Sequence, residues 1–206
     1  MEKLRKRASI EKLLREHGRL FSEELGMDVA SGRADEVFKW FLAAVLFAAP
    51  IRAESAEKTY WEFEKRGVVS PQKILATGWE GLVQILDAGG YTRYDFKTAD
   101  KLLEVMGNLM KDYGGDLVRL HAAASGPRDL EARITALGKG IGPATASIFL
   151  RELRGVWRKA APAPTELEKA AAQKLGIPLA RLLKSLSPRK AARLQAALAR
   201  VGRKLR

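Results

Sequence analysis

Hydrophobic residues recur along this chain at intervals of three and four positions, which is the spacing of one face of an α-helix. The pattern predicts helices over residues 2–25, 36–51, 55–67, 70–78, 79–90, 95–115, 127–140 and 143–155. We expect the first of these to break near His17 and Gly18. No stretch alternates between apolar and polar residues over a convincing length, so the sequence predicts an all-α fold.

The segment 36–51 is apolar on nearly all of its faces, which predicts a central helix that its neighbours bury. Pro50 is expected to end that helix. Farther along, Ser70 is placed to cap a helix, Pro71 to occupy its first position and Gly78 to end it. Helix boundaries are therefore marked by turn residues as well as by periodicity.

The chain has 206 residues, of which 47% are hydrophobic, and this suffices for one large domain or two small ones. It contains no cysteine, which excludes disulfides, thiolate zinc sites and cysteine-bound iron–sulfur clusters. His17 and His121 are too few for a histidine metal centre, so no metal or cofactor is expected. The longest apolar run, 40–51, is about half of what spans a bilayer, and the N-terminus is charged throughout. We expect a cytoplasmic monomer without a membrane partner.

The formal net charge is +13, from 37 Lys and Arg against 24 Asp and Glu. Nearly all of this excess lies in residues 151–206, which contain fifteen basic residues and only three acidic ones. A field of one sign favours a polyanionic partner, with DNA or RNA ahead of an acidic membrane surface. The alternative is a basic tail that only keeps the protein soluble.

The segment "LGKGIGPATASIFLREL", residues 137–153, contains three glycines at alternate positions between two predicted helices. A Rossmann loop would follow a strand and a Walker A loop would contain Gly-Lys-Ser/Thr, and neither feature is present. We therefore expect a hairpin at 140–142, with Ile141 filling the gap between the helices. The free amides of the second helix would bind phosphate oxygens without regard to base sequence.

The segment "LGKGIGPATA" resembles the helix-hairpin-helix motif of DNA repair proteins. The wider chain, over about 36–176, is similar to the helix-hairpin-helix DNA glycosylases of the endonuclease III type, through "FKWFLAAVLFAAPIRAESAEKTYWEF" and "GLVQILDAGGYTRYDFKTADKLLEVMGNLMKDYGGDL". The resemblance implies two helical domains, 34–155 and 1–33 plus 156–206, the latter with basic C-terminal helices, and a DNA-binding cleft between them. It implies duplex DNA as the partner, with a nucleoid-associated location when bound. The implied DNA-binding residues are Lys139, Gly140, Ile141, Gly142, Ala144, Thr145, Arg158 and Arg52.

The chemistry that the resemblance implies is extrusion of a damaged base and cleavage of its glycosidic bond. The family's strand-cleaving members have a lysine where this chain has Ala144, and the family's aspartate falls within 161–164, which contains no carboxylate. The remaining catalytic candidates are Glu166, Glu168 and Lys159. Glu166 is alternatively a solvent-facing acid in the first turn of a helix, and Lys159 is alternatively a phosphate contact.

Pro50 stands where such glycosylases often have a glutamine that fills the space of the extruded base, and Arg52 reaches the same region. Two roles stay open for Trp157, which either stacks on a base or caps the cleft, or else packs between the domains. His121 is expected at the surface or at a helix cap. Two functions remain. One is a monofunctional glycosylase of base-excision repair, and the other is a degenerate relative that binds DNA without catalysis. An RNA-associated role ranks third.

Overall fold

The structure is a computed structural model that describes the backbone of residues 2–204 and the side chains of residues 9–204. Residues 1, 205 and 206, which the predicted domains include, lie outside the described residues. The helices, in chain order, are α1 (Glu2–His17), α2 (Phe21–Glu24), the 3₁₀ helix η1 (Val29–Ser31), α3 (Ala34–Phe47), α4 (Ala53–Lys65), α5 (Pro71–Gly89), α6 (Asp95–Tyr113), α7 (Leu117–Ala123), α8 (Pro127–Thr135), α9 (Pro143–Glu152), α10 (Glu166–Lys174), α11 (Leu179–Ser185) and α12 (Pro188–Lys204). The described residues form no strand, only an isolated bridge between Arg154 and Trp157, and the predicted all-α class is confirmed.

Two predicted breaks in the helices fall at glycines. The chain leaves α1 after His17, and a Cβ at Gly18 would stand 2.3 Å from the carbonyl oxygen of Leu14, so only glycine fits there. Gly78 has φ 68° and ψ 175° within α5, which is therefore two helical pieces joined at a kink. The Ser70 side chain accepts a hydrogen bond from the Lys73 amide at the start of α5, which confirms the predicted cap.

Helix α3 is the centre of the fold, and its residues from Trp40 to Phe47 are almost completely buried. It ends at Phe47, three residues before Pro50. The indole Nε1 of Trp40 donates to the carbonyl oxygen of Phe149 at 2.9 Å, which fastens α3 to α9. Trp40 is fully buried, so its replacement by alanine would cost about 3–5 kcal/mol of stability, mainly through lost packing.

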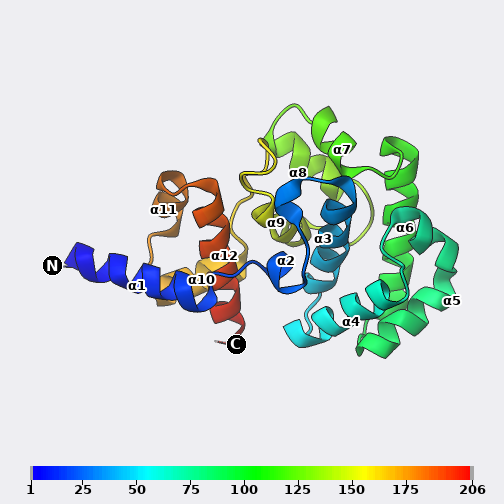
Figure 1. The fold of residues 1–206 in the computed structure, drawn as a ribbon, viewed down its shortest axis with the longest axis horizontal. Coiled ribbons are helices and arrows are strands. Elements are labelled where there is room, and N and C mark those ends of the chain that lie inside the picture. Colours follow the sequence, from blue (N-terminus) through cyan, green and yellow to red (C-terminus); the bar gives the residue numbers. More distant parts are fainter. Residues whose placement is uncertain (1, 205–206) are drawn as a thin grey trace.

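The buried hydrophobic residues form two clusters. The larger one extends from α2 through α9 and includes one side of α12, through Ala192, Ala196 and Ala199. The smaller one joins α1, α10, α11 and the other side of α12, through Leu13, Ala171, Leu179, Leu194 and Leu198 among others. Figure 1 shows α1 and α10–α12 lying together on one side of the molecule and α3–α9 on the other. The predicted division into two domains stays a prediction. Residues 20–29, which it assigned to the domain of the C-terminal helices, pack in the larger cluster.

None of the described helices is long and apolar enough to span a membrane.

Candidate functional site

The glycine-rich segment forms a short loop, 136–142, that joins α8 to α9. Gly140 has φ 89°, and a Cβ there would approach Cε of Lys101 to 2.7 Å, so the loop packs directly on α6. Ile141 is 4% exposed and belongs to the larger cluster. The structure thus contains the expected tight turn between the two helices, closed by a hydrogen bond from the Ile141 amide to the carbonyl oxygen of Gly138 at 3.1 Å, with Ile141 buried in the larger cluster.

The hairpin leaves several backbone donors without a partner. Helix α9 begins after Gly142 with no side-chain cap, and Pro143 has no N–H. Within the described part of the chain, the amides of Gly140, Gly142, Ala144 and Thr145 meet no hydrogen-bond acceptor. The Lys139 amide is already used, since it donates to Oε1 of Glu104 at 3.0 Å. Four amides therefore remain for an anion at the N-terminus of a ten-residue helix.

Cationic side chains border these amides. Lys139 is exposed. Lys101, which the sequence did not indicate, lies against Gly140, and burial lowers its pKa. No local pattern marks Lys101 as a site residue, because it reaches the hairpin only when α6 packs beside it. Arg158 is also exposed.

Thr145 is 4% exposed, so its side chain is largely covered, and its backbone amide is the group that it offers at this surface. Ala144, by contrast, is exposed.

A cleft of about 810 Å³ lies beside the hairpin. Its walls are the end of α3 with the loop into α4, helix α9, the segment 163–169 and the C-terminal part of α12, with one residue each from α2 and α8. The lining residues are Phe21, Phe47, Ala48, Ala49, Pro50, Ile51, Arg52, Ala53, Glu54, Glu131, Pro143, Ala144, Ser147, Ile148, Arg151, Ala163, Pro164, Thr165, Glu166, Leu167, Lys169, Ala199, Arg203 and Lys204. The cleft therefore brings together Pro50, Arg52, Ala144 and the 161–164 loop, which the resemblance singled out from distant parts of the sequence.

The loop 161–164, called the proline-rich loop because it contains Pro162 and Pro164, is held by two side chains. The hydroxyl of Ser147 donates to the carbonyl oxygen of Ala163 at 2.6 Å. Nη2 of Arg154 donates to the carbonyl oxygen of Pro162 at 2.6 Å. Because two fixed donors hold its backbone, the loop forms a defined wall of the cleft.

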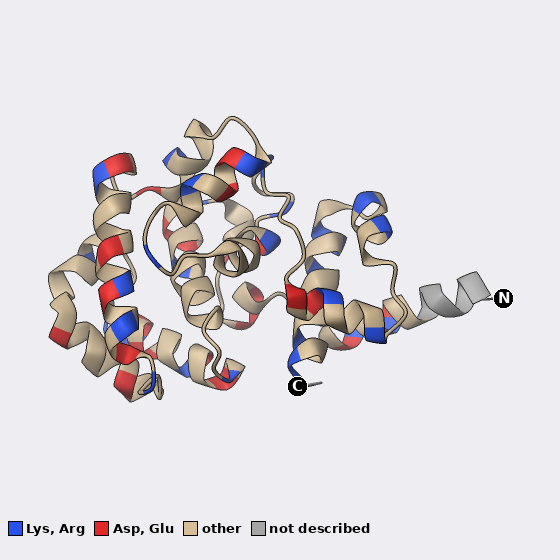
Figure 2. Cartoon of the chain, turned by 180° about the vertical axis from the view of Figure 1, so that it is seen from behind, with Lys and Arg blue, Asp and Glu red and all other residues tan. Residues whose placement is uncertain are grey.

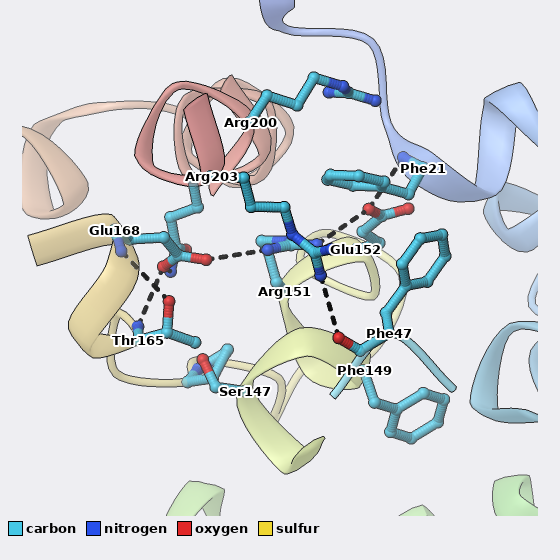
Figure 3. Close-up of polar contacts among 12 residues, drawn as sticks. Phe21, Phe47, Ser147, Phe149, Arg151, Glu152, Thr165, Glu168, Arg200 and Arg203 are labelled. Atoms are coloured by element: carbon cyan, nitrogen blue, oxygen red, sulfur yellow. Dashed lines mark hydrogen bonds and ion pairs between the residues drawn. The ribbon is translucent and has the colours of Figure 1, made fainter. Parts of the chain in front are cut away.

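Glu168 belongs to a buried polar network below the cleft and does not line it. It is fully buried, and its Oε1 accepts from Nη1 of Arg151 at 2.8 Å. Its Oε2 accepts from Nε2 of Gln195 at 2.9 Å and from the Thr165 amide at 3.1 Å. Figure 3 shows this carboxylate turned toward Arg151 and Thr165. Both oxygens are used in holding α9, α10 and α12 together, so the contacts give Glu168 a structural role.

The other two catalytic candidates differ in position. Nζ of Lys159 donates to the carbonyl oxygens of His121 and Ala122, at 2.8 and 3.2 Å, and so caps the C-terminal end of α7. Lys159 does not line the cleft. Glu166 borders the cleft, where its 87% exposed side chain pairs with Lys169 at 2.6 Å. Of the three candidates, Glu166 alone lies at the cleft.

Glu131, which the sequence did not single out, lines the cleft from α8. Burial raises the pKa of this carboxyl, and the positive charge of Arg154 acts in the opposite direction. No described residue hydrogen-bonds or ion-pairs with its side chain. In the sequence, Glu131 looks like any charged position of an amphipathic helix, and its place in the cleft depends on how α8 packs.

Trp157 packs within the protein. It is 4% exposed, stacks on His121 with ring centroids 4.5 Å apart and 9° between the planes, and meets Phe149 edge-on. His121 is consequently half-buried instead of lying at the surface, and its Nε2 has no hydrogen-bond partner among the described residues. Burial and the charge of Lys159 lower the pKa of His121.

Part of the basic C-terminal quarter serves internal contacts. Nη2 of Arg193 lies 2.7 Å from Oε1 of Glu23, and Arg200 donates to the carbonyl oxygen of His17 at 2.8 Å and to Glu24. Arg203 donates to the carbonyl oxygen of Phe47 at 3.0 Å. In Figure 2 the positions of Lys and Arg, coloured blue on the ribbon, are distributed along α10, α11 and α12. Lys174, Arg181 and Lys184 are exposed and form no ion pair with any described residue.

No family model, no curated protein and no solved structure matches this chain. The described residues include no group of three metal-ligating side chains that could hold a metal ion.

Proposed function

We propose that this chain is a DNA-binding protein of base-excision repair, of the helix-hairpin-helix glycosylase type, which binds the backbone of duplex DNA and receives a displaced nucleotide in its cleft. The observation that supports this proposal most strongly is the position of the hairpin. The unpartnered amides at the start of α9 lie next to Pro143 and Ala144, and these two residues also line the cleft. A backbone phosphate and an extruded nucleotide would thus be bound side by side.

The hairpin supplies contacts that are independent of base sequence. Hydrogen bonds from backbone amides to a charged phosphate contribute about 1.5–3 kcal/mol each, and the helix N-terminus adds a favourable dipole. Lys101 and Lys139 add positive charge beside the amides. Arg181 and Lys184, both exposed on α11, contribute further positive charge at the protein surface.

The cleft suits a single nucleotide unit. Its volume, about 810 Å³, falls within the range of about 300–1,000 Å³ typical of small-molecule sites. Chemistry on a base, or inspection of it, requires that the nucleotide leave the duplex stack and enter such a pocket. Pro50 and Arg52 line the cleft in the loop between α3 and α4, and in this proposal they enter the duplex step that the nucleotide leaves.

Catalysis is a separate part of the proposal. Ala144 provides no amine at the cleft, so strand cleavage through a Schiff base at this position is not part of the proposed function. Excision of a base by hydrolysis needs a carboxyl group, which Glu166 or Glu131 would supply at the cleft. The second candidate function is a degenerate relative that binds DNA without excision, and the lack of an aspartate at 161–164 favours it.

The experiment that tests the proposal is a binding titration at several salt concentrations. The partners are a duplex DNA, the same duplex with one abasic analogue, a single strand and an RNA duplex. The proposal predicts the tightest binding for DNA duplexes and an affinity that falls steeply with salt. Equal affinity for the RNA duplex, or no binding to any DNA, would refute it.

A further inference from the structure

The loop 48–52 connects α3 to α4, and in the proposed function it enters the duplex. Helix α3 ends at Phe47, and Pro50 has no N–H with which to continue the helical hydrogen bonds. The Ile51 amide turns to the carbonyl oxygen of Ala49 at 2.8 Å instead of donating to Phe47. The carbonyl oxygen of Phe47 therefore needs a partner from another part of the fold.

Arg203, in the last turn of α12, supplies this partner. Its Nη2 donates to the carbonyl oxygen of Phe47 at 3.0 Å, and its Nη1 makes a longer bond to the carbonyl oxygen of Ile51 at 3.5 Å. One acceptor precedes the loop and the other lies near its end, so a single guanidinium spans the loop. The positive charge also lies at the C-terminal end of α3, where the helix dipole is negative. Figure 3 shows Arg203 extending from α12 toward Phe47.

Aromatic rings support the same contact. The Cζ of Arg203 lies 5.8 Å from the ring centroid of Phe47, and Phe47 meets Phe21 edge-on with 5.2 Å between the ring centroids. Arg200, on the preceding turn of α12, lies over Phe21 with its Cζ 4.0 Å from the centroid. Two arginines of α12 thus pack on two contacting rings at the base of the loop. The position of the loop therefore depends on α12, which is far from it in the sequence.

The double contact requires an arginine. Its planar fork presents N–H donors at a fixed spacing, whereas the ammonium of a lysine is a point charge on a flexible stem. A loop that is held in place before binding loses little conformational entropy when it enters DNA, and a released loop loses more. This restriction applies to Pro50 and Arg52, the exposed residues with which the loop lines the cleft.

We infer that Arg203 is a positioning residue: it fixes the loop 48–52 in the conformation that enters an unstacked step of duplex DNA, and so gives the protein a preference for distorted over intact duplexes. This inference rests on the proposed function, because it concerns the duplex that the hairpin and the cleft bind. It adds the class of duplex that is selected and the residue on which the selection depends.

The test compares two duplexes of the same sequence, one intact and one with a single tetrahydrofuran abasic analogue, which provides an unstacked step. Affinities are measured by fluorescence anisotropy at one salt concentration. For the wild-type chain we expect tighter binding to the abasic duplex by about fivefold or more. Amide hydrogen exchange of the free protein, followed by mass spectrometry, reports the opening of the loop 48–52 independently of DNA.

Arg203→Lys keeps the charge and removes the fork. The affinity for the intact duplex should stay within about twofold of wild type, while the preference for the abasic duplex should fall below about twofold. Amide exchange in 48–52 should become faster, with that of α9 unchanged. Arg193→Lys is the matched control, because Arg193 is also on α12 and binds Glu23 and the carbonyl oxygen of Gly18, not the loop. It should keep the wild-type preference even where it lowers stability.

Pro50→Gly releases the loop without changing Arg203. It should lower the preference to the level of Arg203→Lys, and the double variant should lower it no further, because both changes act on one loop. A merely structural role for Arg203 would weaken binding to both duplexes alike and would leave the two effects additive.

The outcomes distinguish this inference from the proposed function. A preference that survives in Arg203→Lys, or unchanged exchange in its loop, would overturn the positioning role. Equal affinity of the wild-type chain for the two duplexes would also overturn it and would leave the proposed DNA binding standing. Absence of binding to every duplex would refute the proposed function and this inference together.

Discussion

Arg151 and Glu168 form a buried ion pair, 2.8 Å between Nη1 and Oε1, that joins α9 to α10 below the proline-rich loop. Their side chains are 3% and 0% exposed. Arg151 also lies over the ring of Phe21, with its Cζ 5.1 Å from the ring centroid. The neighbouring Glu152 accepts from the amides of Phe21 and Ser22 at 3.0 and 2.9 Å. These contacts tie the start of α2 and the C-terminal helices to the helix that begins at the hairpin.

Removal of one member of this pair should destabilise the fold. Glu168→Ala leaves Arg151 charged and buried without its main partner, which costs about 3–5 kcal/mol for a buried pair. Urea denaturation followed by circular dichroism measures the loss. The double variant Arg151→Met with Glu168→Leu should recover part of it, since it leaves no unpaired charge. A loss of less than about 1 kcal/mol for Glu168→Ala would contradict the structural role.

The basic residues of the C-terminal quarter should separate into structural and DNA-binding groups. The Cζ of Arg200 lies 4.0 Å from the ring centroid of Phe21, and Arg200 also hydrogen-bonds to His17. Arg200→Ala should therefore lower stability, on the order of 1–3 kcal/mol. The double variant Arg181→Ala with Lys184→Ala should leave the thermal unfolding temperature unchanged and reduce the salt dependence of DNA binding. A loss of stability in the double variant, together with a change in DNA binding but not in stability for Arg200→Ala, would contradict this division of the basic residues.

Lys101 should contribute to DNA binding although it is far from the hairpin in the sequence. Lys101→Met removes the charge and preserves much of the chain that packs on Gly140. We expect weaker binding to all duplex sequences and a slope of log affinity against log salt that is smaller by about one unit. Lys111→Met, at the other end of α6, is the control. An unchanged slope for Lys101→Met would exclude a phosphate contact.

The stability of the protein should depend on pH through His121. Its pKa in the folded state is lowered by burial and by Lys159, whereas an unfolded histidine titrates near 6.5. The unfolded chain therefore takes up the proton first. Stability from this residue is fully present above about pH 6.5 and declines as the pH falls from there through the folded pKa.

Urea denaturation between pH 5 and pH 8 measures this effect. His121→Phe preserves stacking on Trp157 and removes the titrating group, so its stability should vary less over this range. A wild-type stability that increases on acidification below pH 6.5 would contradict the assignment.

The parts of the fold that depend on local patterns were predictable. Periodicity and turn residues predicted the helices, the break near Gly18 and the cap at Ser70, because these features are decided within a few residues. The all-round apolar pattern of α3 predicted a central helix for the same reason. Helix α7 was missed, since it has seven residues and its main local signal is the cap at Asp116.

The candidate site was predictable only in part. The glycine spacing indicated the hairpin, but a sequence does not show which carboxylate is already engaged in a buried ion pair. Glu168 looked available and is buried against Arg151, whereas Glu131 looked ordinary and lines the cleft. Likewise, the excess of positive charge in the C-terminal quarter could not show that Arg193 and Arg200 form ion pairs with Glu23 and Glu24. These outcomes depend on tertiary packing.

The most direct test of the central claim is the DNA affinity of Gly142→Asp. Gly142 has φ −98° and open space around its Cβ position, so an aspartate fits without strain and caps α9. Its carboxylate would occupy the amides that the phosphate requires and repel the phosphate. The controls are Gly142→Asn, which caps without charge, and Gly126→Asp, which makes the same change at the start of α8. The account predicts that Gly142→Asp keeps the helical circular dichroism spectrum and binds every duplex at least tenfold more weakly, with Gly126→Asp close to wild type. Wild-type affinity of Gly142→Asp would contradict the account.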